Sequence, residues 1–101
     1  MFGAGNLTHA GVAWQGAIYD PHFMQGGIVL IYATGNRADI PACSTAQPAR
    51  FAIDSGTTQG KAQLPGLLTA FATKQPAVIV GAGNCSVYGD SETIAYFYID
   101  A

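Results

Sequence analysis

The feature that most constrains the fold of this chain is a single helical pattern among short strand-like runs. Apolar residues recur at the spacing i, i+3, i+4, i+7 and i+8, which places them on one face of a helix: Leu64, Leu67, Leu68, Phe71 and Ala72. Because proline fits best in the first turn of a helix, Pro65 predicts a start near Gln63 or Leu64. Pro76 predicts an end near Lys74, since the residue before a proline avoids helical angles. The sequence thus predicts one helix over residues 63–73.

Five strand-like runs flank this helix, three before it and two after it. They are residues 12–19, 28–33, 50–54, 77–80 and 93–99. Asp20-Pro21-His22 is expected to end the first run, and the polar segment 34–39 is expected to form a loop. The order strand, strand, strand, helix, strand, strand is that of the OB-fold. A ferredoxin-like fold would need a second helix between its first two strands, and residues 20–27 are too short and broken to form one.

We therefore expect one α+β, β-rich domain over residues 1–101, because a chain of this length has room for one domain only. The expected architecture is a five-stranded OB-like Greek-key barrel with one helix between strands 3 and 4. The Gly-rich start, residues 1–8, is expected to be flexible.

The small charge of the chain excludes two classes of partner. Its 4 basic residues are scattered, and the formal net charge is −2. A nucleic-acid-binding protein needs a cluster of Lys and Arg to replace phosphate counterions, and a protein that binds an anionic membrane surface needs such a cluster too. The longest apolar run, residues 28–33, is far shorter than the roughly 20 residues that span a bilayer. We expect no nucleic-acid partner, no membrane span and no signal peptide in this sequence.

Two cysteines suggest the compartment. Cys43 and Cys85 both lie in loop-like segments at the ends of strand-like runs, where loops can meet. A bridge between them would close a long loop, worth roughly 4 kcal/mol by chain entropy. Disulfides persist outside the cytoplasm, so this pairing predicts a secreted or periplasmic protein. The alternative is a pair of unconnected thiols.

Several motifs resemble catalytic or cofactor sites without meeting their requirements. The segment 52–58 resembles the active-site strand of aspartic proteases, but the helix follows Asp54 too soon for the flap that such enzymes need. Asp54 and Ser55 are therefore expected to cap a turn. The segment 56–61 lacks the spacing of a phosphate-binding loop. The segment 81–86 is similar to a dinucleotide-binding loop, but no helix follows it and no βαβ unit has room to form. His9, Asp20 and His22 have no metal-ligand spacing. We expect no enzyme activity, no metal and no cofactor.

The second face of the predicted helix bears on association. Its residues are small and uncharged: Gln63, Gly66, Thr69, Ala70 and Thr73. A solvated helix face normally carries charge, whereas a small neutral face allows another helix or sheet to approach closely. The pattern predicts a homo-oligomer in contact through the 63–73 helix. The alternative is a mildly polar, solvated face.

The order of elements resembles that of a known toxin family. The Ala42-Cys43 junction, the short strand 51–54, the Leu/Phe helix and the strand 78–80 are similar to the B subunits of AB5 toxins of the subtilase-cytotoxin and typhoid-toxin type. The resemblance covers roughly residues 27–100 and is one of fold pattern. It implies a secreted OB-fold subunit with one disulfide, assembled into a pentameric ring that binds host glycans. The chain departs from the family in its low charge, its Gly-rich start and the late position of Cys85.

These patterns lead to one functional hypothesis and two alternatives. We expect a secreted or periplasmic non-enzymatic binding module for a carbohydrate or a protein partner. Sugar sites combine aromatic faces with amides and hydroxyls, which selects six candidates: Trp14, Tyr19, Asn84, Ser86, Tyr88 and Tyr96. The first alternative is a small bacterial envelope or secreted protein that acts through protein–protein interaction. The second is an aspartic-protease-like hydrolase.

Overall fold

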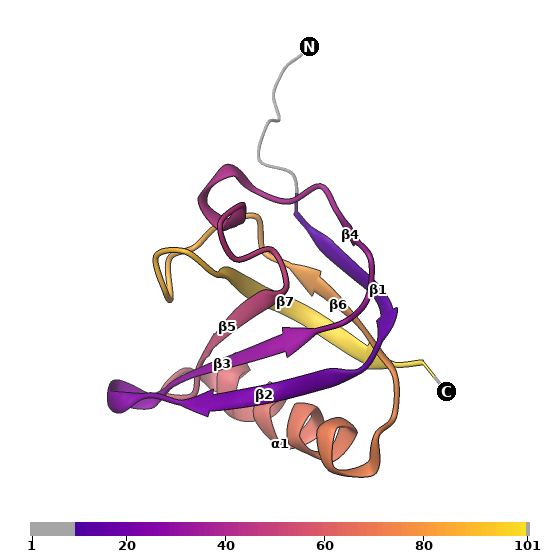
Figure 1. The fold of residues 1–101 in the computed structure, drawn as a ribbon. Coiled ribbons are helices and arrows are strands. Elements are labelled where there is room, and N and C mark those ends of the chain that lie inside the picture. The colour runs from indigo at the N-terminus through magenta and orange to yellow at the C-terminus, as the bar shows by residue number, and fades with distance from the viewer. Residues whose placement is uncertain (1–9, 101) are drawn as a thin grey trace.

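The computed structural model describes residues 10–100. In these residues a curved β-sheet and a single α-helix enclose one core (Figure 1). The predicted flexible start at residues 1–8 lies outside the described residues. The seven strands are β1 (Val12–Gly16), β2 (Ile18–Phe23), β3 (Ile28–Ala33), β4 (Arg37–Ala38), β5 (Arg50–Asp54), β6 (Ala77–Gly81) and β7 (Glu92–Ile99). The helix α1 is Thr58–Thr73, and two short 3-10 helices are η1 (Gln25–Gly27) and η2 (Ala42–Ser44). The predicted α+β, β-rich class is confirmed.

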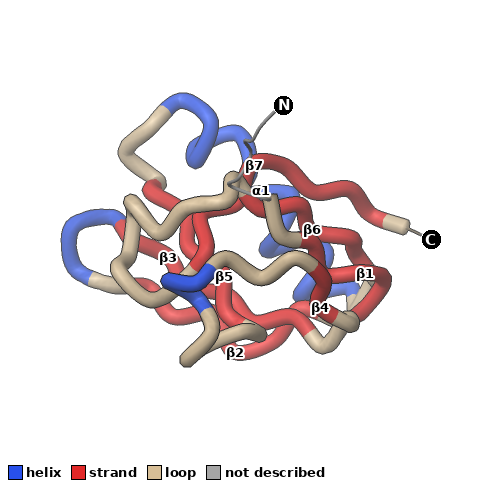
Figure 2. The backbone as a smooth tube through the Cα atoms, turned by 90° about the horizontal axis from the view of Figure 1, so that it is seen from above, coloured by secondary structure: helices blue, strands red, loops and turns tan. Residues whose placement is uncertain are grey.

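The strands form one mixed sheet in the order β2-β3-β5-β7-β6-β1-β4. Only β5 and β7 run parallel, and α1 lies in the crossover connection that such a pair needs. The predicted five-stranded closed barrel is wrong, because seven strands are present and the edge strands β2 and β4 do not pair with each other. Figure 2, viewed from above, shows strands that curve strongly and do not lie in one flat layer.

The two extra strands have different origins. β4 forms within residues 34–39, which were expected to be a loop, and the first predicted strand supplies two strands instead of one. It divides into β1 and β2 at Ala17, whose N–H donates to Thr34 Oγ1 over 2.9 Å and whose carbonyl accepts from the Thr34 N–H over 3.0 Å. Because Ala17 bonds to Thr34 in this way, the ladder of strand hydrogen bonds is interrupted between β1 and β2. The predicted break at Asp20-Pro21-His22 is also wrong, because β2 continues through it with a bulge in which Asp20 has φ 47°. Pro21 is tolerated since β2 is an edge strand, where a missing N–H costs no ladder bond.

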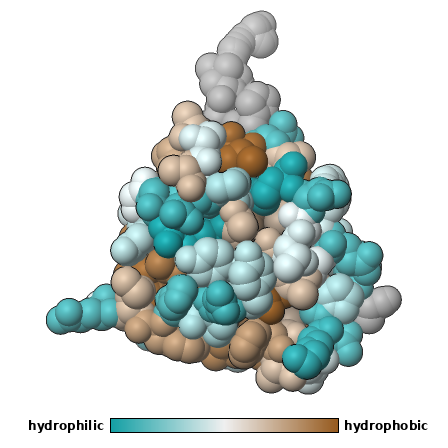
Figure 3. Space-filling model, viewed as in Figure 1, coloured by the Kyte–Doolittle hydropathy of each residue, from teal (hydrophilic) through white to brown (hydrophobic). Residues whose placement is uncertain are grey.

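The core lies between the inner side of the curved sheet and α1. The helix packs against β2, β5 and β7 (Figure 1). Alternate residues of the central strands point inward, and the largest of these are fully or almost fully buried: Ile31, Phe51, Ile53 and Ile79. Leu67 of α1 is buried against them. On the face drawn in Figure 3, hydrophobic side chains are scattered among hydrophilic ones. No helix in residues 10–100 is long and apolar enough to cross a membrane.

The helix begins earlier than its proline predicted. Thr57 is the N-cap, with its Oγ1 accepting from the Gly60 N–H over 3.0 Å, so Pro65 lies in the helix interior. Sequence reasoning placed the start near Gln63 because an interior proline removes a helical hydrogen bond. The cap and the packing of α1 outweigh that cost. The end is as predicted: α1 stops at Thr73, and Lys74 follows in the left-handed conformation.

The small residues of α1 are explained partly by packing within the chain. Ala70 is 1% exposed and belongs to the core, although the spacing had placed it on the outer face. Gly66 lies against the Phe97 ring, where an added Cβ would come within 2.9 Å of Cζ. Phe71, expected in the core, is 40% exposed. Gln63 donates its NH₂ group to the Ala95 carbonyl of β7. Three of the five residues therefore serve the fold of one chain, and oligomerisation through α1 stays a prediction.

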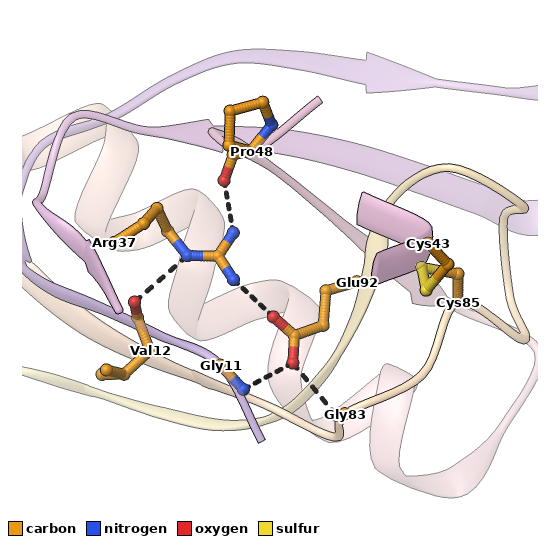
Figure 4. Close-up of polar contacts among 8 residues, drawn as sticks. All are labelled: Gly11, Val12, Arg37, Cys43, Pro48, Gly83, Cys85 and Glu92. Carbon is orange, nitrogen blue, oxygen red and sulfur yellow. Dashed lines mark hydrogen bonds and ion pairs between the residues drawn. A yellow bond between two sulfur atoms is a disulfide. The ribbon is translucent and has the colours of Figure 1, made fainter. Parts of the chain in front are cut away.

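The predicted disulfide is confirmed. Cys43 in η2 is bonded to Cys85 in the loop between β6 and β7, with 6.2 Å between their Cα atoms. The bridge joins two loops that lie side by side at the same end of the molecule (Figures 1 and 4). The two cysteines are separated by 42 residues in the sequence, so the bond closes a long loop.

Candidate functional site

The candidate site begins on the outer side of β3 and β5. These strands are antiparallel neighbours, with Tyr32 opposite Arg50 and Ile28 opposite Asp54. Because side chains alternate along a strand, Arg50 and Asp54 point away from the core that receives Phe51 and Ile53. The structure thus places a basic and an acidic residue at opposite ends of the outer face of β5.

Aromatic rings gather around Arg50. Tyr32 lies 5.4 Å from Tyr19 and 5.6 Å from His22, measured between ring centroids. The Arg50 guanidinium lies 5.9 Å from the Tyr32 ring and 5.7 Å from the Tyr88 ring. Tyr19 and Tyr88, both predicted from the sequence, therefore belong to one group that joins β2, β3 and the loop 82–91.

Arg50 also fastens the end of that loop. Its Nε donates to Ser91 Oγ over 2.7 Å, and one of its terminal nitrogens contacts Asp90 Oδ1 over 2.5 Å. The hydrogen bond from Arg50 lowers the pKa of the Asp90 carboxyl below its usual value, so the pair stays charged at neutral pH. Arg50 thereby acts as an anchor for the loop, with its charge balanced by Asp90.

Asn84 organises the middle of the loop. Its Oδ1 accepts three hydrogen bonds, from the Ser86 N–H over 3.1 Å, from Ser86 Oγ over 2.8 Å and from Thr93 Oγ1 over 2.9 Å. The Asn84 carbonyl also accepts from the Thr93 N–H over 2.9 Å. Asn84 therefore ties the loop to the start of β7. Since its oxygen is fully used inside the protein, its NH₂ group is the part left for a ligand.

A cleft of about 440 Å³ opens between this loop, β5 and the first turns of α1. Its polar side chains come from three elements that are remote in sequence: Asp54, Thr57, Gln59, Gln63, Asn84, Ser86 and Thr93. Apolar atoms of Ala52, Val87 and Ile94 complete the lining. A concave site with a few convergent polar groups is the usual form of a small-molecule site.

Asp54 holds the edge of the cleft in a defined turn. Its Oδ1 accepts from the Gly56 N–H over 2.9 Å, and its carbonyl accepts from Thr57 Oγ1 over 2.7 Å. The Ser55 hydroxyl donates to the Gly27 carbonyl over 2.7 Å. The predicted turn at Asp54 and Ser55 is therefore present, and it fixes the position of the Asp54 carboxylate relative to the start of α1.

A buried ion pair lies at the base of the loop (Figure 4). Arg37 on β4 and Glu92 at the start of β7 approach within 2.5 Å, and the Glu92 side chain has no exposed surface. Glu92 Oε2 accepts from the Gly11 and Gly83 N–H groups over 2.8 and 3.0 Å. Burial lowers the pKa of Arg37, and the charge of Glu92 and the hydrogen bond to it act in the opposite direction. The pair fixes Gly83, the residue before Asn84.

Arg37 extends this anchor to two further segments. Its Nε donates to the Val12 carbonyl over 3.1 Å, and another nitrogen donates to the Pro48 carbonyl. Its guanidinium carbon lies 4.4 Å from the centre of the Phe51 ring. One side chain thus connects β1, the segment before β5 and β7. Its contacts are all structural, so Arg37 is unavailable to a ligand.

The structure separates the six predicted ligand residues into three groups. Asn84 and Ser86 line the cleft, and Tyr19 and Tyr88 lie in the aromatic group around Arg50, outside the cleft lining. Trp14 and Tyr96 lie elsewhere, on the outer side of β1, β6 and β7. Sequence reasoning could not separate them, because it ranks residue types without assigning them to a face of the sheet.

Five polar cleft residues escaped sequence reasoning as ligand groups: Asp54, Thr57, Gln59, Gln63 and Thr93. Gln59 and Gln63 were missed since the helix was expected to begin only at residue 63. Asp54 was interpreted only as a turn residue. The alternation of Arg50, Ala52 and Asp54 against Phe51 and Ile53 was the available signal, because it places the first three on the side away from the core.

The aromatic face of β1, β6 and β7 forms a second surface. Trp14, Tyr96 and Tyr98 are 54%, 56% and 47% exposed. Val80 lies opposite Tyr96 and Val78 lies opposite Tyr98, so these side chains share one face. We refer to Trp14, Val78, Val80, Tyr96 and Tyr98 as the aromatic face. It carries no charged residue.

Comparison with known proteins supplies no relative. No family model, no curated protein and no solved structure matches the chain. Within residues 10–100, no three His, Cys, Asp or Glu side chains gather as metal ligands would. His9 lies outside these residues. The chemistry of the cleft therefore carries the functional argument.

Proposed function

We propose that this protein is a non-enzymatic carbohydrate-binding module and that the cleft beside β5 is its binding site. The observation that carries the proposal is the composition of the cleft: a carboxylate, three amides and three hydroxyls converge on a concave space whose lining is completed by the apolar atoms of Ala52, Val87 and Ile94. A sugar presents hydroxyls that need both donors and acceptors, and it also has an apolar face that packs on aromatic rings. The cleft supplies the donors and acceptors together with apolar surface, and the Tyr19–Tyr32–Tyr88 group lies around Arg50 at the other end of β5.

The order of elements supports the same location. We infer an OB-like connectivity in which β3 and β5 take the places of strands 2 and 3, and the loop 82–91 takes that of the loop between the last two strands. In OB-folds, this face and this loop bind oligosaccharides and oligonucleotides. The scattered basic residues disfavour an oligonucleotide, because Arg37 and Arg50 are both neutralised by carboxylates.

The disulfide supports a location outside the cytoplasm. Cys43–Cys85 is the type of bond that oxidising compartments preserve. We therefore propose a secreted or periplasmic protein, in which a sugar on a cell surface or in the surrounding medium is an accessible ligand.

A glycan array, followed by calorimetry on the strongest hit, tests the function. We expect Gln59→Ala to weaken binding about 3- to 10-fold, the range that corresponds to loss of one hydrogen bond. Gln59 is exposed and makes no side-chain hydrogen bond within residues 10–100, so its replacement leaves the fold intact. Gln75→Ala is the matched control, since Gln75 is exposed and lies outside the cleft. The proposal fails if the folded protein binds no glycan or if both variants bind like the wild type.

The aromatic face favours a second candidate function, self-association as an interaction protein. Three half-exposed aromatic side chains on one face of the sheet resemble the centre of a protein interface. The net charge of −2 provides little repulsion between copies.

Light scattering over a range of concentrations tests this candidate. We expect a rise in mass at high micromolar concentration that Trp14→Ser combined with Tyr96→Ser abolishes. Phe71→Ser is the control, because Phe71 is an exposed aromatic residue on α1, the helix through which association was predicted from the sequence. Loss of association in the Phe71 variant alone would assign the contact to α1 instead, and a constant monomer mass would eliminate both surfaces.

A further inference from the structure

We propose that the cleft selects uncharged sugars and rejects sugar acids. This inference rests on the carbohydrate-binding function proposed above and specifies its ligand class. It follows from the charges that line the cleft, from the hydrogen-bonding groups that remain unused there, and from the position of Asp54 at the start of α1.

The formal charge of the cleft is negative. Asp54 is the one ionisable side chain among its lining residues. Both arginines are committed elsewhere, Arg37 to the buried Glu92 and Arg50 to Asp90. Lys61 and Lys74, the remaining basic residues of the chain, do not line the cleft. A bound carboxylate or sulfate would therefore meet a like charge without a cation to balance it.

The start of α1 does not reverse this conclusion. A helix N-terminus attracts anions through its unpaired N–H groups and its dipole. Here one of those groups, the Gly60 N–H, donates to Thr57 Oγ1, and the Gly56 N–H just before the N-cap donates to Asp54 Oδ1. The full negative charge of the Asp54 carboxylate, close to this helix start, outweighs the roughly half positive charge that the helix dipole places there.

The unused hydrogen-bonding groups match hydroxyls. Gln63 donates its NH₂ group to the Ala95 carbonyl over 2.8 Å, which leaves its side-chain oxygen as an acceptor. Asn84 has the opposite arrangement, with its oxygen engaged and its NH₂ group left as a donor. The second oxygen of Asp54 makes no hydrogen bond within residues 10–100 and adds a charged acceptor. A hydroxyl can donate to Asp54 or Gln63 and accept from Asn84, whereas a carboxylate can only accept.

NMR titration with matched sugar pairs tests the inference. Each pair is a methyl glycoside and the corresponding methyl glycuronide, which differ only in whether carbon 6 carries a hydroxyl or a carboxylate. We expect the neutral member to shift the amide signals of Gln59, Asn84 and Thr93. We expect the acid to bind at least about tenfold more weakly, because placing like charges together costs more than 1 kcal/mol.

Asp54→Asn is the decisive variant. Asparagine keeps the oxygen that accepts from the Gly56 N–H, so the turn is preserved while the charge is removed. We expect neutral sugars to bind roughly tenfold more weakly, since a charge-assisted hydrogen bond is about twice as strong as a neutral one, and the preference over the acids to disappear. Asp39→Asn is the control: it makes the same charge change at an exposed site where φ is 53°, a conformation that asparagine accepts.

The outcomes separate the two proposals. Both proposals are supported if the amide signals of the cleft respond to neutral sugars alone. The preference for neutral sugars over acids must then disappear in Asp54→Asn and persist in Asp39→Asn. If an acid shifts the cleft signals as strongly as its neutral partner, or if Asp54→Asn leaves the preference unchanged, the inference fails while the carbohydrate site stands. If no sugar shifts any cleft signal, the proposed function fails and the inference fails with it.

Discussion

Replacing Glu92 by glutamine is expected to lower the free energy of unfolding by about 3–5 kcal/mol, the cost of breaking a buried ion pair. The substitution leaves the Arg37 guanidinium without a counter-charge, in a place where its side chain is 7% exposed. It also brings an NH₂ group close to donors, because the carboxylate now accepts from Gly11, Gly83 and Arg37 at once. The total free energy of unfolding of a native domain is about 5–15 kcal/mol, so this substitution would remove much of the stability of the protein.

Urea unfolding followed by far-ultraviolet circular dichroism measures this loss. Asp39→Asn is the control and is expected to leave the midpoint unchanged, because Asp39 is exposed. A double variant, Arg37→Met with Glu92→Met, is expected to recover part of the stability, since an apolar pair removes the isolated charge. The Gly11 and Gly83 N–H groups would still lack their acceptor, so recovery is incomplete. A midpoint for Glu92→Gln equal to that of the wild type would contradict the structural role of the pair.

Local signals predicted the second half of the chain well. Pro76 ends α1, and the β-branched and aromatic residues that follow form β6 and β7 close to the expected bounds. The first half depends more on remote contacts. Whether Asp20-Pro21 ends a strand depends on whether that strand is central or at an edge, and only the assembled sheet decides this. The interior position of Pro65 likewise reflects the Thr57 cap together with packing.

The same distinction applies to the candidate site. Asn84 and Ser86 could be predicted because they flank Cys85 in a polar loop. Trp14 and Tyr96 have the residue type of sugar-binding side chains, but β1 and β7 place them on the aromatic face, away from the cleft. Residue type is visible in the sequence, whereas the face depends on register and on bulges such as the one between Val80 and Gly81.

Removal of the disulfide by Cys43→Ser with Cys85→Ser is expected to destabilise the protein by about 4 kcal/mol in the chain-entropy model. The bridge spans 42 residues and connects η2 with the loop between β6 and β7. Cys43 is exposed and Cys85 is half-buried, so serine buries little extra polar surface. The expected cost therefore comes mainly from the added freedom of the unfolded chain.

The bridge also bears on the cleft, because Asn84 and Ser86 stand on either side of Cys85. Thermal and urea unfolding of the oxidised wild type, the reduced wild type and the double serine variant separate the two effects. We expect the reduced protein and the variant to unfold at the same, lower midpoint, and we expect the variant to bind sugar more weakly even where it is fully folded. Equal midpoints with and without a reductant would show that the bridge does not stabilise the fold. Unchanged binding by the folded variant would mean that Asn84, held by Thr93, and the Arg37–Glu92 pair position the loop without the disulfide.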